Sequence, residues 1–193
     1  MAKTFFVSDS HFFHKRIVEL TNRNKDTTAE NHTDWLVDLW NSQVKEDDTV
    51  WHLGDFAFTS SKNKLQDLLD RLNGRINFIY GNHCDVKTFE FLFHEATNNK
   101  IWSIQHYKEI KIQGNTVVLF HFPIAAWHKQ HYGSWHLHGH CHGSYEVQGK
   151  ILDVGLDSAY NILGKHRFFT ESDICDIMAD KMAISVDHHT VKE

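Results

Sequence analysis

The stretch TVWHLGDFAFTSSKNKLQDLLDRLNGRINFIYGNH, residues 49–83, decides the fold. Its apolar runs at 49–53 and 76–80 are short and rich in β-branched and aromatic residues, which predicts two buried strands. Between them, leucines recur at the spacing of one helix face, and Asn73-Gly74 supplies a stop signal for that helix. These leucines are Leu65, Leu68, Leu69 and Leu72. A strand, a helix and a second strand in this order predict neighbouring parallel strands of an α/β sheet.

Further elements are predicted on both sides of this unit. The run 4–7 is typical of a buried strand, and large apolar residues at 35–40 recur at helical spacing. In the second half we expect two β-hairpins, a strand between them, and a helix that begins at Thr170, where Asp173 completes a capping pattern. The hairpins pair 110–113 with 116–120 and 145–147 with 150–154, and the strand between them is 135–138.

No repeat, low-complexity tract or flexible linker divides the sequence, so we expect one domain over residues 1–193. Its content of 41% hydrophobic residues is enough for a buried core. The motifs described below span about residues 4–160. A C-terminal helix is expected at 170–182, followed by a loose tail at 186–193.

Composition excludes several classes of partner. The formal net charge is -5 at pH 7, so an extended nucleic-acid-binding surface is not expected. No signal peptide precedes the first strand, and no apolar run reaches the length of a membrane span. Together with three cysteines that cannot all pair within the chain, these features predict a cytoplasmic protein that does not contact membranes. The unusual feature is the presence of 17 histidines, since histidine is the commonest metal ligand.

Carboxylate, amide and imidazole side chains follow five of the predicted strands. Open α/β sheets bind ligands beyond the carboxyl ends of their strands, so we expect these side chains to converge. They are Asp9 and His11, Asp55, Asn82 and His83, His121, and His140 and His142. Imidazole and carboxylate ligands suit manganese, iron, zinc or nickel ions, whereas an all-oxygen set would suit magnesium or calcium better. The pattern therefore indicates a transition-metal centre.

The spacing of these residues supports the same hypothesis. Asp9 and His11 are two residues apart, so in an extended segment both side chains leave the same side of the chain, and the same holds for His140 and His142. Glycines at positions 54, 81 and 139 would let the backbone turn sharply and approach a metal closely. A single strand-end aspartate is more often a turn residue. Five such motifs, each after a strand, favour metal binding.

Taken together, the motifs resemble the signature of the calcineurin-like metallophosphoesterase superfamily, which is Asp-x-His, Gly-Asp, Gly-Asn-His, a lone His and Gly-His-x-His. The resemblance covers about residues 4–160. More narrowly, the stretches 8–12, 53–57 and 138–140 resemble a compact bacterial and phage branch of predicted phosphoesterases. This resemblance implies an α/β fold, a four-layer α-β-β-α sandwich of two mixed β-sheets flanked by helices.

The resemblance also implies a role for each motif residue. The first of two divalent metal ions would be held by Asp9, His11, Asp55 and His142, and the second by Asp55, Asn82, His121 and His140. Asp55 would bridge the ions, because each of its oxygens can serve one metal. Manganese is the expected metal, and iron, zinc and nickel are the alternatives. A hydroxide between the ions would attack phosphorus, while His83 would act as general acid or as a donor to the phosphate.

The sequence departs from the family pattern at one position. The acid that usually follows Gly-Asn-His is replaced by Cys84, and Asp85 is a candidate to support His83 in its place. We interpret Cys84 as a small buried residue, with an extra metal ligand as the alternative. Two other residues near the first motif, His14 and Arg23, could reach substrate phosphate, although a solvated surface position is the favoured interpretation for both.

Other branches of the superfamily fit the sequence less well. Its protein phosphatases carry an arginine before Gly-Asn-His and an Asp-Arg-Gly run after Gly-Asp, where this chain has Tyr80 and residues 56–58, Phe-Ala-Phe. At 193 residues there is little room for the capping domain of its nucleases. The amphipathic insertion expected of a lipid pyrophosphatase is not found either. Aromatic residues that could stack on a base are interpreted as core residues, and they are Trp102, Trp127 and Tyr132.

These observations predict a dinuclear-metal-dependent hydrolase of phosphate esters, and more specifically a phosphodiesterase that acts on a small or nucleotide-type substrate. The alternatives are a broad phosphomonoesterase and a metal-binding scaffold of the same fold without catalysis. Diester chemistry is favoured because a donor at His83 helps most when the leaving group is a poor alkoxide. The physiological substrate, the native metal pair and the oligomeric state are left open.

Overall fold

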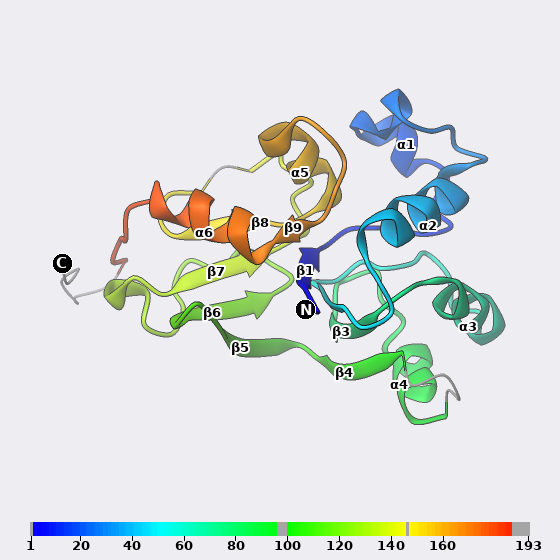
Figure 1. The fold of residues 1–193 in the computed structure, drawn as a ribbon, viewed down its shortest axis with the longest axis horizontal. Helices are drawn as coiled ribbons and strands as arrows, with labels where there is room; N and C mark the ends of the chain where they lie inside the picture. The colour runs from blue at the N-terminus through cyan, green and yellow to red at the C-terminus, as the bar shows by residue number, and fades with distance from the viewer. Residues whose placement is uncertain (1, 96–99, 146, 187–193) are drawn as a thin grey trace.

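Two β-sheets form the centre of the molecule (Figure 1) in the computed structural model, which describes residues 2–95, 100–145 and 147–186. The first sheet has the strand order β4-β3-β2-β1-β9, and the second has the order β5-β6-β7-β8. The strands are β1 (Thr4–Val7), β2 (Thr49–His52), β3 (Arg75–Ile79), β4 (Ile101–Gln105), β5 (Tyr107–Ile112), β6 (Asn115–Phe120), β7 (Trp135–His138), β8 (Ile151–Asp153) and β9 (Phe169–Thr170). Each sheet contains both parallel and antiparallel neighbours.

Helices cover the outer face of the first sheet. They are α2 (His32–Gln43), α3 (Lys62–Arg71) and α4 (Val86–Glu95), and short helical turns α1 (Ile17–Leu20) and η1 (Asn22–Lys25) precede them. Alternate residues of β1, Phe5 and Val7, join one apolar cluster with Leu36 of α2, Leu68 of α3 and Phe89 of α4. β2 and β3 pair in parallel on either side of α3, so the prediction made from residues 49–83 is confirmed.

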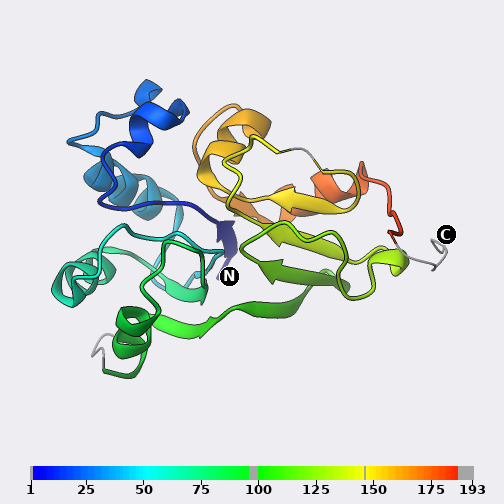
Figure 2. The ribbon, with the colours of Figure 1, turned by 180° about the vertical axis from the view of Figure 1, so that it is seen from behind.

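The other face of the first sheet packs against the second sheet. Phe6, which points away from Phe5 and Val7, belongs to a second apolar cluster with Leu119 of β6 and Leu137 of β7. Two helices, α5 (Leu156–Leu163) and α6 (Glu171–Ala179), flank the second sheet (Figure 1), and a short turn η2 (Gln130–Tyr132) precedes β7. Seen from behind, β1 lies between the two halves of the molecule (Figure 2). The expected fold class, two mixed sheets flanked by helices, is confirmed.

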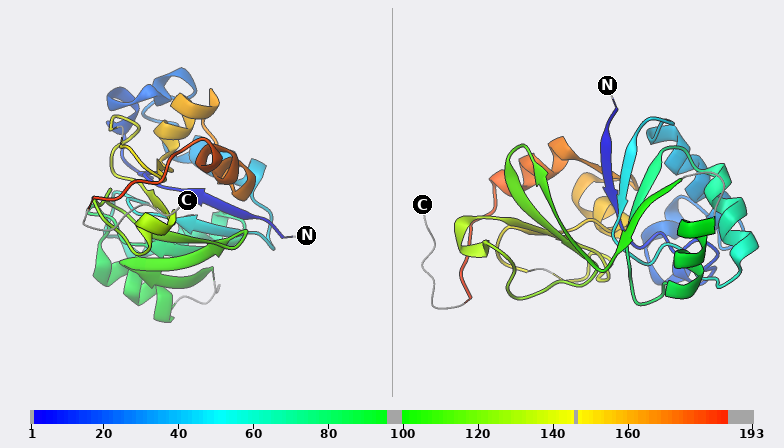
Figure 3. Two further views of the ribbon diagram at one scale, coloured as in Figure 1. Left: turned by 90° about the vertical axis from the view of Figure 1, so that its left-hand side faces the viewer. Right: turned by 90° about the horizontal axis from the view of Figure 1, so that it is seen from below.

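One segment links the sheets directly. β4 ends at Gln105 and β5 begins at Tyr107, so the chain passes from the edge of the first sheet to the edge of the second with one residue between them. The two strands diverge at that point when the molecule is seen from below (Figure 3, right). This connection joins the edge strands of the two sheets.

Two sequence predictions need correction. The first hairpin is confirmed, since β5 and β6 pair antiparallel, but the second is wrong, because β8 pairs in parallel with β7 and residues 145 and 147 form no strand. The Gln148-Gly149 pair is a local turn signal, and a local signal does not determine which strand becomes the partner. The C-terminal helix ends at Ala179, short of residue 182, and the tail beyond residue 186 lies outside the described residues.

None of the helices in the described ranges combines the length and the apolar character needed to cross a lipid bilayer.

Charged hydrogen bonds at the start of α6 should contribute to the stability of the protein. Thr170 and Asp173 form a reciprocal capping box, and Arg167 binds both carboxylate oxygens of Asp173 at 2.7 and 2.6 Å. The hydrogen bonds from Arg167 lower the pKa of Asp173 to about 2, below the unfolded value of roughly 3.9. A depressed carboxylate pKa adds stability above the unfolded pKa, and that stability is lost as pH falls through the folded pKa.

We therefore expect Asp173→Asn to lower the free energy of unfolding by about 1 kcal/mol near pH 7. Urea titrations of both proteins should give a constant difference above about pH 5, which shrinks as pH falls and vanishes only below about pH 2. A difference that stays the same over this pH range would show that the Asp173 charge contributes nothing to the cap.

Candidate metal centre

The loops that follow five strands meet at one point. The loop after β1 pairs with the loop after β2, because the Asp9 amide donates to the Gly54 carbonyl at 3.0 Å and the His11 amide donates to the Asp55 carbonyl at 2.9 Å. The loops after β6 and β7 are joined in the same way, by the amide of Gly139 and the carbonyl of His121 at 2.9 Å. Backbone hydrogen bonds therefore hold the motif residues in place before any ligand is considered.

The motif residues adopt an unusual backbone conformation. Five of them have positive φ angles, namely Asp9 (57°), His11 (52°), Asp55 (54°), His140 (70°) and His142 (50°). The left-handed backbone conformation costs about 1–2 kcal/mol for each residue other than glycine. Residues strained in this way are concentrated at functional sites. The expectation that Asp9 and His11 share one side of an extended segment is wrong. Their side chains converge because each residue turns the chain.

The close approach expected at the glycines is confirmed. A Cβ atom on Gly54 would lie 2.7 Å from Cγ of His121, and its φ of 101° also favours glycine. A Cβ atom on Gly139 would lie 2.5 Å from Oδ2 of Asp9. Larger residues at either position would push candidate ligands apart, so these glycines set how closely the loops pack.

Asp55 lies at the centre of the cluster and is almost fully buried. Its Oδ1 accepts a hydrogen bond from the amide of His83 at 2.9 Å. Its Oδ2 lies 3.8 Å from Nε2 of His11 and 3.5 Å from Nε2 of His121. Burial alone would raise the pKa of Asp55, but its contact with His121 helps to lower it to about 2. Oδ1 is thus held by a backbone hydrogen bond and Oδ2 faces two imidazole rings, whereas both oxygens of Asp55 were expected to be free to bind a metal ion.

Asp9 and His11 form the first side of the cluster with His142. Oδ2 of Asp9 accepts from the amide of His140 at 2.9 Å, while Oδ1 is buried without a hydrogen-bond partner and lies 3.9 Å from Nε2 of both His11 and His142. Both ring nitrogens of His11 are also buried and unpaired. Burial raises the pKa of Asp9 to about 6 and lowers the pKa of His11 to about 2.

The second side of the cluster is formed around Asn82. Nδ1 of His121 donates to the carbonyl of Leu53 at 2.7 Å, which directs its Nε2 at the Asn82 side-chain oxygen 3.0 Å away. Nδ1 of His140 lies 3.0 Å from the same oxygen. In a neutral His121 the proton is on Nδ1, which binds the Leu53 carbonyl. The lone pair of Nε2 then faces the Asn82 oxygen, which is also an acceptor. A cation between the two atoms would relieve that repulsion.

The residues therefore fit a pair of cations. In each of two groups of residues, the potential ligand atoms all lie within 4.8 Å of one another. One group is Asp9, His11 and His142, and the other is Asp9, Asp55 and His121. Buried polar atoms without a protein partner normally bind a water molecule or an ion. Histidine and carboxylate donors suit manganese, iron, zinc or nickel. The cluster is a candidate metal-binding site.

The cluster opens into a cleft of about 850 Å³, within the size range of small-molecule sites. His83 is exposed there, with its ring 5.7 Å from that of His11 and 5.9 Å from that of Phe58. His14 also lines the cleft, and its ring lies 5.7 Å from His11 and 4.5 Å from Phe58. A smaller hollow of about 320 Å³, lined by Phe58 and His83 among others, adjoins the cleft at His83.

The other residues singled out from the sequence lie as follows. Cys84 is partly buried against the core, and its sulfur accepts from the amide of Gly81 at 3.4 Å. Burial raises the pKa of the Cys84 thiol. Asp85 accepts from the hydroxyl of Thr88 at 3.0 Å in the first turn of α4. Arg23 is 0% exposed, so neither a phosphate contact nor a solvated position is correct.

Several residues at the site carry no recognisable sequence signal. Asp157 accepts a hydrogen bond from Nδ1 of His142 at 2.7 Å, and burial alone would raise its pKa, but Arg23 and His142 hold that pKa well below its usual range. Leu20 and Tyr145 line the cleft and are 67% and 57% exposed. By contrast, aromatic residues interpreted as core are half exposed outside the cleft, and they are Trp102 and Tyr132.

Comparisons with known proteins agree with this geometry. A family model described as calcineurin-like phosphoesterase matches residues 2–189. The Gene 66 protein of Mycobacterium phage L5 is 28% identical over 195 residues, covering 88% of this chain and 93% of the phage protein. An uncharacterized protein of Methanocaldococcus jannaschii is 31% identical over 147 residues, covering 75% of this chain and 72% of that protein.

A solved structure has a similar fold. It is a protein of unknown function from Aquifex aeolicus, which aligns with a TM-score of 0.65 and 22% identity over 92% of this chain and 100% of its own. At this level of identity the likeness extends to the fold alone.

Proposed function

The chain belongs to the calcineurin-like phosphoesterase family, and from that premise we propose that it is a dinuclear-metal-dependent phosphodiesterase acting on a small or nucleotide-type ester. Members of this family are phosphoesterase hydrolases. The observation that carries the proposal is Oδ2 of Asp55, a buried carboxylate oxygen that faces Nε2 of His11 on one side and Nε2 of His121 on the other. A carboxylate placed in this way is suited to a position between two cations.

Seven side chains would hold the metals. Asp9, His11, Asp55 and His142 would hold the first ion, and Asp55, Asn82, His121 and His140 the second. We take manganese as the first candidate and iron, zinc and nickel as the alternatives, because the set mixes imidazole nitrogen with carboxylate and amide oxygen. When bound, such a pair supplies an activated water nucleophile and neutralises charge on the phosphate oxygens.

The protein's own contribution is orientation and proton transfer. The Asp55 carboxylate holds the backbone of His83 through the 2.9 Å hydrogen bond to its amide, so the exposed imidazole stays beside the cluster. From that position His83 can donate a hydrogen bond to the phosphate or a proton to the leaving oxygen, which typically contributes about 10²–10⁴-fold. Buried Leu53 fixes the orientation of His121 through its carbonyl.

The shape of the site supports a diester. Two hollows, of about 850 and 320 Å³, meet at His83, so an organic group on each side of a phosphate would find a place. Exposed apolar residues line both, with Leu20 and Tyr145 in the larger hollow and Phe58 in the smaller one. In the described part of the chain, neither hollow is lined by lysine or arginine. An uncharged organic group is therefore favoured over a polyphosphate or a long nucleic acid.

Comparison of two chromogenic esters tests this preference. With chelator-stripped protein and saturating manganese, we expect higher kcat/KM for bis-p-nitrophenyl phosphate than for p-nitrophenyl phosphate, because only the diester fills both hollows. The same assays with nickel, zinc and magnesium would rank the metals. A clear preference for the monoester would replace the diesterase by a broad phosphomonoesterase. Tight metal binding without cleavage of either ester would favour a binding scaffold.

A further inference from the structure

Arg23 in η1 is a buried arginine whose hydrogen-bonding capacity is completely used. Its Nε donates to Oδ1 of Asp157 at 2.9 Å, and its Nη2 donates to Oδ2 of Asp157 at 2.8 Å and to the carbonyl of Asp9 at 2.5 Å. Its Nη1 donates to the carbonyl of Ser10 at 2.8 Å and lies 3.1 Å from Nε2 of His32. A guanidinium has five N–H groups, so every one of them has a partner.

This arginine is connected to His142 through Asp157. Oδ2 of Asp157 accepts from Nδ1 of His142 at 2.7 Å, so in a neutral His142 the lone pair is on Nε2, which lies 3.9 Å from Oδ1 of Asp9. A carboxylate behind a metal-binding histidine fixes both the orientation of the ring and its tautomer. Arg23 therefore donates a hydrogen bond to the backbone carbonyl of one candidate ligand, Asp9. It is linked to another, His142, through the carboxylate of Asp157.

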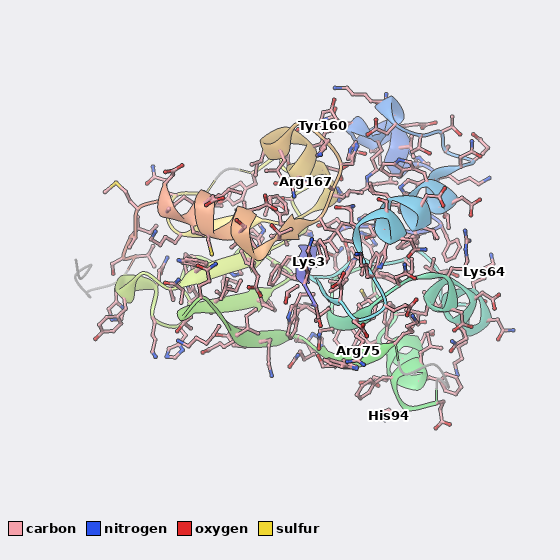
Figure 4. The ribbon with its side chains drawn as sticks, in the orientation of Figure 1. Lys3, Lys64, Arg75, His94, Tyr160 and Arg167 are labelled. Carbon is pink, nitrogen blue, oxygen red and sulfur yellow. The ribbon has the colours of Figure 1, made fainter. Side chains whose placement is uncertain are left out.

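Other contacts hold η1 against α5 around the same pair. The side-chain amide of Asn22 donates to that of Asn161 at 3.3 Å, and Nζ of Lys25 lies 4.7 Å above the ring of Tyr160, which is labelled on α5 in Figure 4. Asp157, Tyr160 and Asn161 are three and four residues apart, so they share one face of the helix. The contacts between η1 and α5 thus help to hold Asp157 in place.

Stability alone is a poor explanation for this arrangement. Asp157 and Arg23 are 2% and 0% exposed, and the desolvation penalty of a buried ion pair often cancels its Coulombic gain. An apolar pair of similar volume would fill the space equally well. An apolar pair would, however, leave the carbonyls of Asp9 and Ser10 and the ring nitrogen of His142 without partners.

We propose that Arg23 is a positioning residue for one of the two metal ions, the one bound by Asp9, His11 and His142, and that it acts through Asp157. This inference rests on the proposed dinuclear function. It predicts a selective effect, since His121 on the second side is held by the carbonyl of Leu53 instead. Lysine cannot replace Arg23, because a single ammonium group lacks the planar fork that binds Asp157.

The test is a manganese titration of chelator-stripped protein that resolves two binding steps, carried out on wild type, Arg23→Lys and Asp157→Asn. In both variants we expect one step to weaken about 10–100-fold and the other to change by less than about threefold. Electron paramagnetic resonance at two equivalents of manganese gives a second readout. The spin-coupled signal of a manganese pair should be replaced by the six-line signal of an isolated ion. Activity is not needed for either readout.

The matched control is Arg167→Lys, which weakens another arginine fork on an aspartate, that of Asp173, in a pair that does not line the cleft. It should lose stability but keep both manganese steps. Unchanged binding in both Arg23→Lys and Asp157→Asn, or equal weakening of both steps, would overturn the positioning role. Should Arg23→Lys fail to fold, Asp157→Asn decides the question by the same criteria. Wild-type protein that binds no manganese would overturn the dinuclear function itself.

Discussion

Asp55→Asn should lose at least one metal ion and nearly all hydrolysis. An amide at this position can still accept the hydrogen bond from the amide of His83, but it would turn an NH₂ group towards Nε2 of His11 and of His121. It would also remove the negative charge between the two proposed ions. Metal ions contribute several kcal/mol of charge stabilisation, so kcat should fall about 10³-fold or more. Elemental analysis and ester hydrolysis measure the two effects separately.

Asp48→Asn is the matched control for this variant. Asp48 is a buried carboxylate whose two oxygens accept the amides of Lys3 and Lys45 at 2.7 and 2.8 Å, at the opposite end of β2. We expect this change to lower stability while leaving metal content and kcat close to wild type. If Asp55→Asn retained two ions and most of its turnover, the central position assigned to Asp55 would be wrong.

The second large effect is expected at His83. Its imidazole is exposed at the junction of the two hollows, and its backbone rather than its ring contacts Asp55. His83→Asn should therefore keep both metal ions and lose about 10²–10⁴-fold in kcat. The loss should be larger for an alkyl ester, whose leaving group needs a proton, than for a p-nitrophenyl ester. Turnover of a matched pair of esters and elemental analysis of the variant provide the measurement.

His14→Asn controls for the removal of an imidazole from the cleft. Its ring is as far from the ring of His11 as that of His83, 5.7 Å, and it lies closer to Phe58, at 4.5 Å against 5.9 Å. We expect a smaller loss of turnover, with the same loss for both esters. If metal content fell in His83→Asn, His83 would have to be reassigned from proton donor to metal ligand.

Most strands were predictable because their signals are local. Short apolar runs identified β1, β2, β3 and β7, and the Gly-containing turn predicted at 114–115 identified the β5–β6 hairpin, whose turn lies one residue earlier, at 113–114. The partner of β8 was not predictable, since strand pairing depends on segments far apart in the sequence. β9 is only two residues long and is defined by its pairing with Phe5 and Phe6, so it has no periodicity of its own.

The candidate site was predictable in its residue types and not in its local geometry. Each motif follows a strand end, and the sheet brings such ends together without further information. The positive φ angles of Asp9 and His11 were missed because an Asp-x-His spacing does not reveal whether the segment is extended or turned. The burial of Arg23 and its pairing with Asp157 were missed for a different reason. Its partner Asp157 lies 134 residues away, and a polar residue in a polar segment gives no sign of burial.

The central claim is that the chain uses two adjacent divalent ions to hydrolyse a phosphate ester. Its most direct test is the rate of bis-p-nitrophenyl phosphate hydrolysis by chelator-stripped protein as manganese is added in known equivalents. The account predicts no hydrolysis without metal and a rate that rises until two equivalents are bound per chain. Hydrolysis that survives complete removal of metal, or that reaches its maximum with one equivalent, would contradict it.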